Sequence, residues 1–504
     1  MDMTVRRLSG ADAEALLLDQ ISQNSAGIRS TLSAFEANSA TSAWMGALRG
    51  IEEFINIPMF GLDDENIVRE LLAIRLDDTM LPMHVARVQT MLIAELAPPV
   101  VDRFVQTLIM VSAIGQGFRM YGLECGEELR SIASAVGYFQ SRRRQMVALM
   151  YCIPAECTGT QSVATWDALN VFLPVVEHSC VGLTSLYRSL IMARIHIDFV
   201  LTVGSDRCDG NYFLETLDEA FLEPDRVAIT EVAADRVDPE KLQQLLDLPK
   251  GQIFSAAELC NDLMLMEASY AEFDLGKTEF GSMARFIVTC CQYVRDDYYI
   301  SLGCAEFRNL MSLCGLSTIA QRRLVYCGNS FEEAVNSFAP FITIGRTTMT
   351  TVTLLSRFAY SWKTFCLNRI KRFQIRSGFI FEKEVKKALA QQGFVIHEIK
   401  RIEGREFDVV ATKKNSIYNI QCKNNLLDLT RMEQDPKLFV RYNQRLDKYF
   451  AQALRKEEER ENLLLTKLGL SAVKHIVLSK FPLATKNPRV MAFREISQFS
   501  SRFT

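Results

Sequence analysis

The sequence predicts a multidomain protein in which a large all-helical N-terminal region precedes a C-terminal α/β domain. Through residues 1–360, apolar residues recur at spacings of three and four, which is typical of amphipathic helices. Beyond residue 376, one helical segment is followed by several short runs of β-prone residues. The charge changes at the same place: residues 371–504 hold 27 Lys and Arg against 15 Asp and Glu, whereas residues 1–370 hold 30 against 45.

The N-terminal region contains several windows with helical periodicity. They cover residues 12–23, 65–76, 99–112, 127–150, 175–203 and 253–272. The intervening segment 204–251 is acidic and rich in turn-forming pairs, so we expect a boundary there. This predicts a helical domain over residues 1–204, a second helical subdomain with a regulatory or oligomerising role over 205–360, and a third domain over 361–504. The hinge before the third domain is expected near residues 345–376.

The composition is that of a soluble protein with a substantial core. Of the 504 residues, 48% are hydrophobic and 23% charged. The N-terminus lacks the pattern of a signal peptide, and the thirteen cysteines follow no disulfide framework, so we expect free thiols in the cytoplasm. The most apolar stretch, residues 181–203, contains Arg188, Arg194 and Asp198, which favours a buried helix over a membrane span.

A zinc site is the less favoured alternative for part of the N-terminal region. Cys152, Cys157, His178 and Cys180 are of the types that bind structural zinc. Their spacing matches no familiar zinc finger, and helical cores accept single cysteines readily. We therefore expect these side chains to be packed in the core.

The C-terminal elements can be predicted in chain order. Phe381, Val385 and Leu389 recur at helical spacing, and Gly393 ends this helix, which is expected to carry Glu382 in its first turn. A carboxylate there is also favoured by the helix macrodipole. The later expected elements are strands over 394–396, 405–412 and 417–423, a long charged helix over 434–468, and strands over 474–479 and 489–493.

The two strands over 405–412 and 417–423 carry a candidate site. Lys413 to Ser416 form a turn cluster, so the two strands should pair as a hairpin. Side chains alternate along a strand, which places Gln421 and Lys423 on one face and Cys422 on the other, where it would be a small buried residue. If Asp408 points toward Gln421 and Lys423, a carboxylate, an amide oxygen and an ammonium group converge. Phosphodiester hydrolysis uses such a set to hold a hard cation and stabilise the charged transition state.

These residues resemble a known nuclease family. Gly378-x-x-Phe381-Glu382, Asp408 and Gln421-x-Lys423, in this order of elements, resemble the restriction-endonuclease-like superfamily with the PD-(D/E)xK motif, and most closely its Mrr-like branch. The resemblance covers about residues 370–500 and implies a restriction-endonuclease-like α/β domain with a central mixed sheet. It implies a catalytic set of Asp408, Gln421, Lys423 and Glu382.

The resemblance also implies a cofactor, which would be Mg²⁺ or Mn²⁺. Asp408 and the backbone carbonyl of Cys422 would be its ligands, with Glu382 and Glu406 as further candidates, although Glu406 could equally face solvent at a strand edge. Gln421 departs from the commonest pattern, in which this position is acidic, and would orient the attacking water. The Gln-x-Lys form is typical of the Mrr-like branch.

The basic excess of the C-terminal domain predicts a nucleic-acid partner. The candidate phosphate-binding residues are Arg372, Arg376, Lys383, Lys387, Lys413 and Lys414. The resemblance implies DNA as the substrate, in restriction or antiviral defence. Two alternatives stay open: a catalytically silent nucleic-acid-binding or scaffold protein, and an RNA-directed nuclease. The helical region is expected to form a homo-oligomer or bind a protein partner, with no membrane involved.

Overall fold

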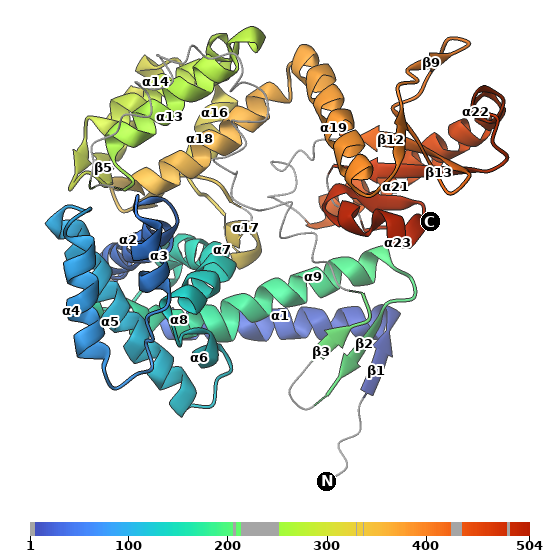
Figure 1. The fold of residues 1–504 in the computed structure, drawn as a ribbon. Coiled ribbons are helices and arrows are strands. Elements are labelled where there is room, and N and C mark those ends of the chain that lie inside the picture. Colours follow the sequence, from blue (N-terminus) through green and yellow to red (C-terminus); the bar gives the residue numbers. More distant parts are fainter. Residues whose placement is uncertain are drawn as a thin grey trace.

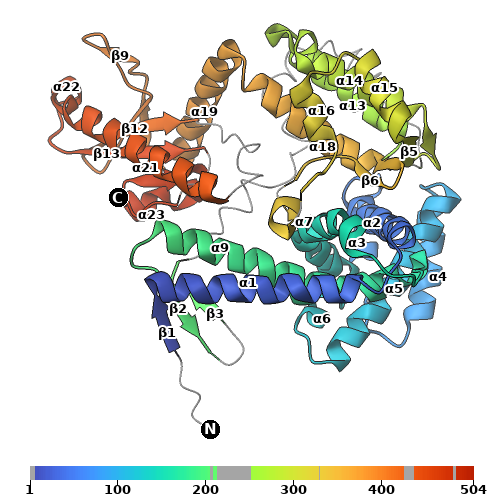
Figure 2. The same ribbon diagram turned by 180° about the vertical axis from the view of Figure 1, so that it is seen from behind.

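The structure is a computed structural model that describes residues 6–204, 208–212, 251, 253–328, 330–335, 337–424, 436–480 and 484–504. Two helical lobes precede a C-terminal α/β domain (Figures 1 and 2). The expected boundary at 204/205 and most of the acidic segment 204–251 lie outside the described residues.

The first lobe is a helical assembly around a single core. Its largest fully buried side chains include Trp44, Phe54, Phe104, Phe139 and Phe172. The helices are α1 (Gly10–Leu32), α2 (Ala37–Phe60), α3 (Glu65–Leu72), α4 (Leu81–Leu92), α5 (Pro98–Met120), α6 (Cys125–Glu128), α7 (Ile132–Glu156), η1 (Thr165–Asp167), α8 (Ala168–Val175), the π-helical η2 (Val176–Val181) and α9 (Gly182–Ile195). Helices are therefore present in the expected windows 12–23, 65–76, 99–112 and 127–150, although α3 ends at Leu72 and α7 begins only at Ile132.

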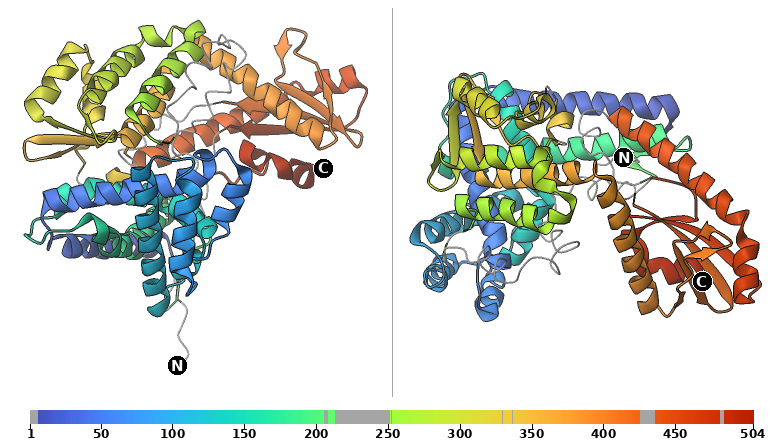
Figure 3. Two further views of the ribbon diagram at one scale, coloured as in Figure 1. Left: turned by 60° about the vertical axis from the view of Figure 1, so that its left-hand side comes forward. Right: turned by 90° about the horizontal axis from the view of Figure 1, so that it is seen from above.

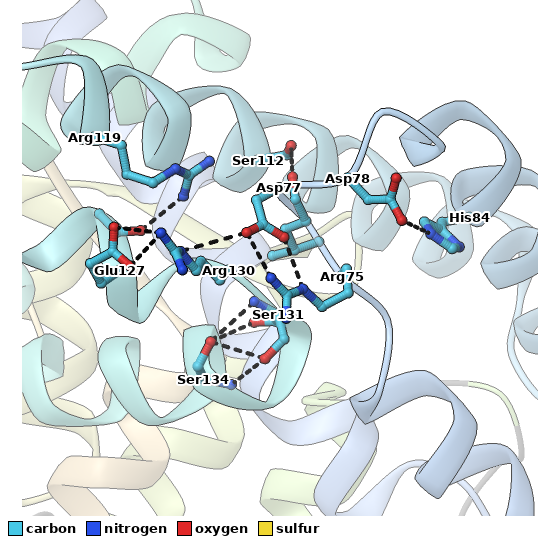
Figure 4. A network of polar contacts seen from close by, with 12 residues as sticks. Arg75, Asp77, Asp78, His84, Ser112, Arg119, Glu127, Arg130, Ser131 and Ser134 are labelled. Carbon is cyan, nitrogen blue, oxygen red and sulfur yellow. Dashed lines mark hydrogen bonds and ion pairs between the residues drawn. The ribbon is translucent and has the colours of Figure 1, made fainter.

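Polar contacts tie the start of α7 to the segment before α4 (Figure 4). The Asp77 carboxylate accepts hydrogen bonds from Nε and Nη2 of Arg75, at 2.9 and 2.8 Å. Arg130 lies 3.6 Å from the same carboxylate. Ser131 and Ser134 form a capping box that satisfies amide groups at the start of α7. These contacts fix the loop that joins α3 to α4 against the lobe.

The run from η1 to α9 is the most apolar helical stretch. Residues Thr165–Ile195 are long and apolar enough to cross a membrane by length and composition alone, and 44% of the most apolar window is buried within the protein. Core helices of soluble proteins pass the same test, so this is weak evidence for a span. The predicted helical window 175–203 ends early, because α9 stops at Ile195 and β2 begins at Val200.

The N-terminal region is not entirely helical, which corrects the sequence expectation. The first lobe contains a small antiparallel sheet of β1 (Arg6–Ser9), β2 (Val200–Val203) and β3 (Cys208–Gly210). The second lobe contains a four-stranded sheet in the order β4 (Val294–Arg295), β5 (Tyr299–Gly303), β7 (Thr347–Thr351) and β6 (Ile342–Ile344). These strands are two to five residues long, too short to produce a clear alternating pattern in the sequence.

The second lobe has a core of its own. Its elements are α13 (Ala256–Ser269), η4 (Ala271–Phe273), η5 (Leu275–Lys277), α14 (Glu279–Cys291), β4 (Val294–Arg295), β5 (Tyr299–Gly303), α15 (Cys304–Leu313), α16 (Thr318–Leu324), α17 (Phe331–Val335), β6 (Ile342–Ile344), β7 (Thr347–Thr351) and α18 (Val352–Leu367). The Thr-rich part of the expected hinge is strand β7. The core extends to Leu367, so the expected boundary at 360/361 falls inside α18.

The C-terminal domain has a mixed sheet. Its elements are α19 (Lys371–Gln391), β8 (Val395–His397), β9 (Arg401–Ile402), β10 (Arg405–Glu406), β11 (Val409–Lys413), β12 (Ser416–Lys423), α21 (Pro436–Glu458), α22 (Glu461–Leu468), β13 (Val473–Ser479), β14 (Val490–Ala492), η6 (Phe493–Gln498) and α23 (Phe499–Phe503). The sheet order is β14-β13-β12-β11-β8. Strands β8, β11 and β12 pair antiparallel, whereas β12, β13 and β14 pair parallel. The long charged helix expected over 434–468 is two helices.

The faces of this sheet are covered by different helices (Figure 3). Phe381, Val385 and Leu389 of α19 pack with Tyr418 and Ile420 of β12 on one face. On the other face, Phe450 and Leu454 of α21 pack with Val477 of β13, and Leu464 of α22 packs with Ile417. Alternate residues of β12 therefore face α19 and α21, as the period of a strand requires.

The C-terminal domain also rests on the first lobe. Val440 of α21 and Ala484 belong to the core of the first lobe. Lys486 pairs with Asp198, and its ammonium lies 5.3 Å from the centroid of the Tyr212 ring. The Tyr212 ring stacks on His196 at 4.0 Å. The domain is therefore held through α21 as well as through its covalent link from α18.

Candidate active site

The predicted hairpin is present and places Asp408 beside Cys422. Val409 of β11 pairs with Ile420 of β12, and Lys414 and Asn415 form the tight turn with φ of 49° and 63°. Asp408 directly precedes β11, and its Oδ2 accepts a hydrogen bond of 2.8 Å from the Cys422 amide. The N–H and C=O groups of a strand residue point to the same edge, so the Cys422 carbonyl also faces Asp408.

Gln421 and Lys423 share the face of β12 that is directed toward α21. Lys423 Nζ donates a 3.0 Å hydrogen bond to Gln421 Oε1, and Gln421 is buried. The Lys423 ammonium also lies 5.6 Å from the centroid of the Tyr449 ring on α21. The Cys422 side chain lies among apolar residues on the opposite face. The alternation expected for this strand is therefore confirmed.

Glu382 lies on α19 and approaches the same site, but not from the first turn of the helix. α19 runs from Lys371 to Gln391, so Glu382 is near its middle. The macrodipole acts only on the first turn and does not account for this residue. Ser377 Oγ of α19 accepts a 2.8 Å hydrogen bond from Asn424 Nδ2, which ties this helix to the end of β12.

The pKa values of Glu382 and Asp408 are both raised. Burial, reinforced by the negative charge of Asp408, raises the pKa of Glu382 to about 7, against the opposing charges of Lys386 and Lys400. Burial also raises the pKa of Asp408, while the Lys423 ammonium, the Cys422 amide and Arg460 oppose that rise. A cation bound beside these two acids would favour their charged forms and so lower both pKa values.

The oxygen donors at this point suit a hard divalent cation. They are the carboxylates of Asp408 and Glu382 and the carbonyl of Cys422, all of the kind that Mg²⁺ and Mn²⁺ prefer. Glu406 is different: its side chain is 67% exposed and pairs with Arg401. The structure thus favours the solvent-facing alternative for Glu406. Among the described residues, no cluster of three or more His, Cys, Asp or Glu could hold a metal ion, so any cation here relies on carbonyl or water ligands as well.

A buried polar network behind the site was missed from the sequence. Asn419, on the same face as Gln421, donates from Nδ2 to Glu457 Oε2 at 2.7 Å and lies 3.2 Å from His475 Nδ1. Nε2 of His475 is 3.3 Å from Glu461 Oε2. Burial lowers the pKa of His475, consistent with a neutral ring that accepts from Asn419 and donates to Glu461.

This network also holds a second positively charged side chain, that of Arg460. Arg460 Nε donates to Glu457 Oε2 at 3.1 Å, and a second guanidinium nitrogen pairs with Oε1. The guanidinium carbon lies 5.1 Å from the centroid of the Phe407 ring. Its positive charge acts on Asp408, as does that of Lys423. The sequence signal that could have predicted this polar face is the recurrence of polar residues at every second position of β12, namely Asn419, Gln421 and Lys423. No such signal predicts a role for Arg460, because the segment around it is rich in charged residues.

The predicted phosphate-binding residues fall into two groups. Arg376, Lys383 and Lys387 are exposed on one stripe of α19, at spacings of seven and four. Arg372 is exposed but lies 3.4 Å from Asp274 of the second lobe.

The lysines of the hairpin turn lie elsewhere. Lys413 Nζ donates to Gln392 O at 2.8 Å and to Ser500 Oγ at 2.7 Å, so its role is structural. Lys414 is exposed, but the turn is at the far end of β11, about 17 Å from Asp408 along the strand. These two lysines therefore do not border the candidate site.

The cysteines considered for zinc are free thiols in the first lobe. Cys157 and Cys180 are buried and Cys152 is half-buried. Burial, more than any neighbouring charge, raises the pKa of the thiols of Cys152 and Cys157 to about 12. Among the residues that the structure describes, these cysteines are in no group of three or more His, Cys, Asp or Glu that could hold a metal ion.

Comparisons with protein-family models, with curated proteins and with solved structures gave no match to this chain.

Proposed function

We propose that the C-terminal domain is a metal-dependent endonuclease that hydrolyses phosphodiester bonds of DNA. One observation carries the proposal: α19, the start of β11 and the end of β12 bring Glu382, Asp408, Gln421 and Lys423 to one end of the sheet. The mixed sheet between α19 and α21 supports the resemblance to the restriction-endonuclease-like superfamily.

Asp408, the Cys422 carbonyl and Glu382 would hold Mg²⁺ or Mn²⁺. The raised pKa of both acids supports this assignment, because a cation would remove the electrostatic cost of their charged forms. When bound, the cation supplies Lewis acidity toward the scissile phosphate. Because Gln421 is neutral, the proposed metal site has two carboxylates. We therefore expect it to bind the metal ion more weakly than sites with three carboxylates do.

The side chains of this protein have separable roles in the reaction. Gln421 orients the attacking water through its amide, and its own position is held by the Lys423 ammonium at 3.0 Å. Lys423 positions that water and offsets the charge that develops on the phosphate. Arg460, held by the buried Glu457, supplies a second fixed positive charge. The charged groups of Lys423 and Arg460 are both held in place before substrate arrives, so these side chains need not reorganise during the reaction.

The DNA backbone would approach along α19. Arg376, Lys383 and Lys387 form an exposed basic stripe on the helix that carries Glu382. Such a stripe provides affinity that does not depend on sequence and that weakens with salt. The helical lobes would control this domain or bind a partner, and the thirteen free thiols support a cytoplasmic setting.

The test is cleavage of supercoiled plasmid and of single-stranded RNA by the full chain, with Mg²⁺, Mn²⁺ or EDTA. We expect plasmid cleavage with either metal and none with EDTA, and its loss in Asp408→Asn and Lys423→Met. Glu384→Gln is the matched control, because Glu384 is exposed on the same helix. Metal-dependent DNA binding without cleavage would favour the silent alternative, and cleavage of RNA alone would favour the RNA-directed one. Activity that survives both active-site substitutions would refute the assignment of the site.

A further inference from the structure

A cavity of about 440 Å³ lies at the seam between the two helical lobes. One wall is α18, whose Phe358 and Trp362 belong to the core of the second lobe. The opposite wall includes Glu333 of α17, a helix whose buried side chains belong to the core of the first lobe. Its volume is within the range of about 300–1,000 Å³ found for small-molecule sites, which are common between domains.

The segment after α16 completes the cavity and joins both lobes. Tyr326 lines it and stacks on Tyr151 of α7 at 4.7 Å. The Tyr326 hydroxyl donates to the Ser330 carbonyl at 3.0 Å, which ties Tyr326 to the residue that precedes α17. Cys327 is an exposed thiol in the wall. A ligand in this cavity would therefore contact elements from both lobes.

The polar chemistry of the cavity is provided by adjacent arginines at the end of α16. Arg322 is exposed and Arg323 is half-buried, and both line the cavity. The Arg323 guanidinium rests on the Phe365 ring, with its carbon 4.6 Å from the centroid. Guanidinium groups bind phosphate through paired hydrogen bonds, and their planar faces stack on aromatic rings. The Arg323 guanidinium is thus supported by an aromatic ring, and Arg322 adds a more exposed positive charge to the lining.

We propose that this cavity binds a nucleotide, with its base stacked on the Arg323 guanidinium and its phosphate held by Arg322. Glu333 lies in the same wall and would accept a hydrogen bond from an exocyclic amine or a ribose hydroxyl. The volume of about 440 Å³ accommodates a mononucleotide, which combines an aromatic base with an anionic phosphate.

The position of the cavity links the ligand to the candidate nuclease. The Phe365 ring also contacts Arg369, whose guanidinium carbon lies 5.3 Å from the ring centroid. Arg369 belongs to the three-residue connection between α18 and α19, and α19 carries Glu382 (Figure 1). A base stacked on Arg323 would stabilise the contacts that Arg323 and Arg369 make with the Phe365 ring. It would thereby favour one orientation of α19. This regulatory role rests on the proposed nuclease function, whereas nucleotide binding does not.

Binding can be tested without any cleavage assay. Calorimetric titration of the full chain with AMP, ATP, adenosine and inorganic phosphate separates the roles of base and phosphate. We expect AMP and ATP to bind more tightly than adenosine or phosphate. Arg322→Ala and Arg323→Ala should each weaken nucleotide binding about tenfold or more, since each removes a charged or stacked contact. Arg285→Ala, an exposed arginine elsewhere on the second lobe, should change nothing.

A second measurement places the ligand in the cavity. Mass spectrometry of the Cys327-containing peptide after a pulse of N-ethylmaleimide should show slower modification when AMP is present. Thermal unfolding of each variant establishes that it is folded. Absence of saturable binding by all four probes would overturn the proposal. So would equal affinities of phosphate and AMP, or undiminished AMP binding by the two folded variants.

Discussion

Glu382→Gln should stabilise the metal-free C-terminal domain at alkaline pH and leave it nearly unchanged at acid pH. The pKa of Glu382 is raised from 4.5 to about 7 in the folded protein. An acid whose folded pKa is raised keeps its full contribution to stability below the unfolded pKa and loses it as the pH rises toward the folded pKa. The loss therefore develops between about pH 4.5 and pH 7, and above that range it is constant.

The size of the effect follows from the same shift. At about 1.4 kcal/mol per pKa unit, a change from 4.5 to about 7 corresponds to about 3 kcal/mol. Because the Glu382 side chain is partly exposed to solvent, screening reduces this to roughly 1 to 2 kcal/mol. The neutral glutamine avoids this cost, so the variant should be the more stable protein at pH 8 by that amount. At pH 5 we expect a difference below about 0.5 kcal/mol.

Hydrogen exchange is the appropriate assay, because the chain contains several cores that need not unfold together. Exchange of peptides that cover β11 and β12, measured in EDTA and corrected for the intrinsic pH dependence, reports the opening free energy of this sheet. Glu384→Gln controls for removing a negative charge from the exposed part of α19. An equal gain at pH 5 and pH 8, or no gain at pH 8, would refute the raised pKa of Glu382.

Further outcomes follow from the contacts of single residues. Asp408→Asn should abolish Mn²⁺ binding in calorimetric titrations while keeping the fold, because an amide oxygen can still accept the Cys422 N–H. Arg460→Met should lower the single-turnover cleavage rate about 100-fold at saturating metal, and an unchanged rate would exclude Arg460 from the reaction. Lys413→Met should cost about 1 to 2 kcal/mol of stability by hydrogen exchange without altering DNA affinity, since its hydrogen bonds are internal. The pair Lys383→Ala and Lys387→Ala should reduce the slope of log Kd against log salt by about 2, measured by fluorescence anisotropy.

The strand pairs of the candidate site could be predicted because their signals are local. The turn after Lys413 and the period of two in β12 determine which side chains share a face, and both are visible within sixteen residues. The start of α19 could not be placed in the same way. Residues 371–377 are mostly polar and carry no capping signal, so their helical state depends on packing against Tyr270 and Phe273 through Phe373.

The remaining features depend on contacts between distant segments. Arg460 and His475 reach the site because α22 and β13 lie beside β12, and no spacing in the sequence encodes that. The boundary between the two helical lobes could not be predicted from the sequence either. α17 lies between β5 and β7 in the chain, yet its side chains pack into the first core, so the two helical lobes interlock instead of following each other.

The polar residues of β12 imply a trade-off between the thermal stability of the domain and its proposed activity. This central strand commits Asn419, Gln421 and Lys423 to a face where its neighbour β13 presents Val477 to a hydrophobic core. Buried polar groups contribute less to stability than well-packed aliphatic ones, even when their hydrogen bonds are made. An engineer who replaced Asn419 and Glu457 with leucine and methionine could obtain a more heat-resistant domain, but it would have lost the support of Arg460. Selection for thermal tolerance alone would therefore be expected to replace the supporting residues Asn419 and Glu457 first. The residues proposed to bind the metal would change later.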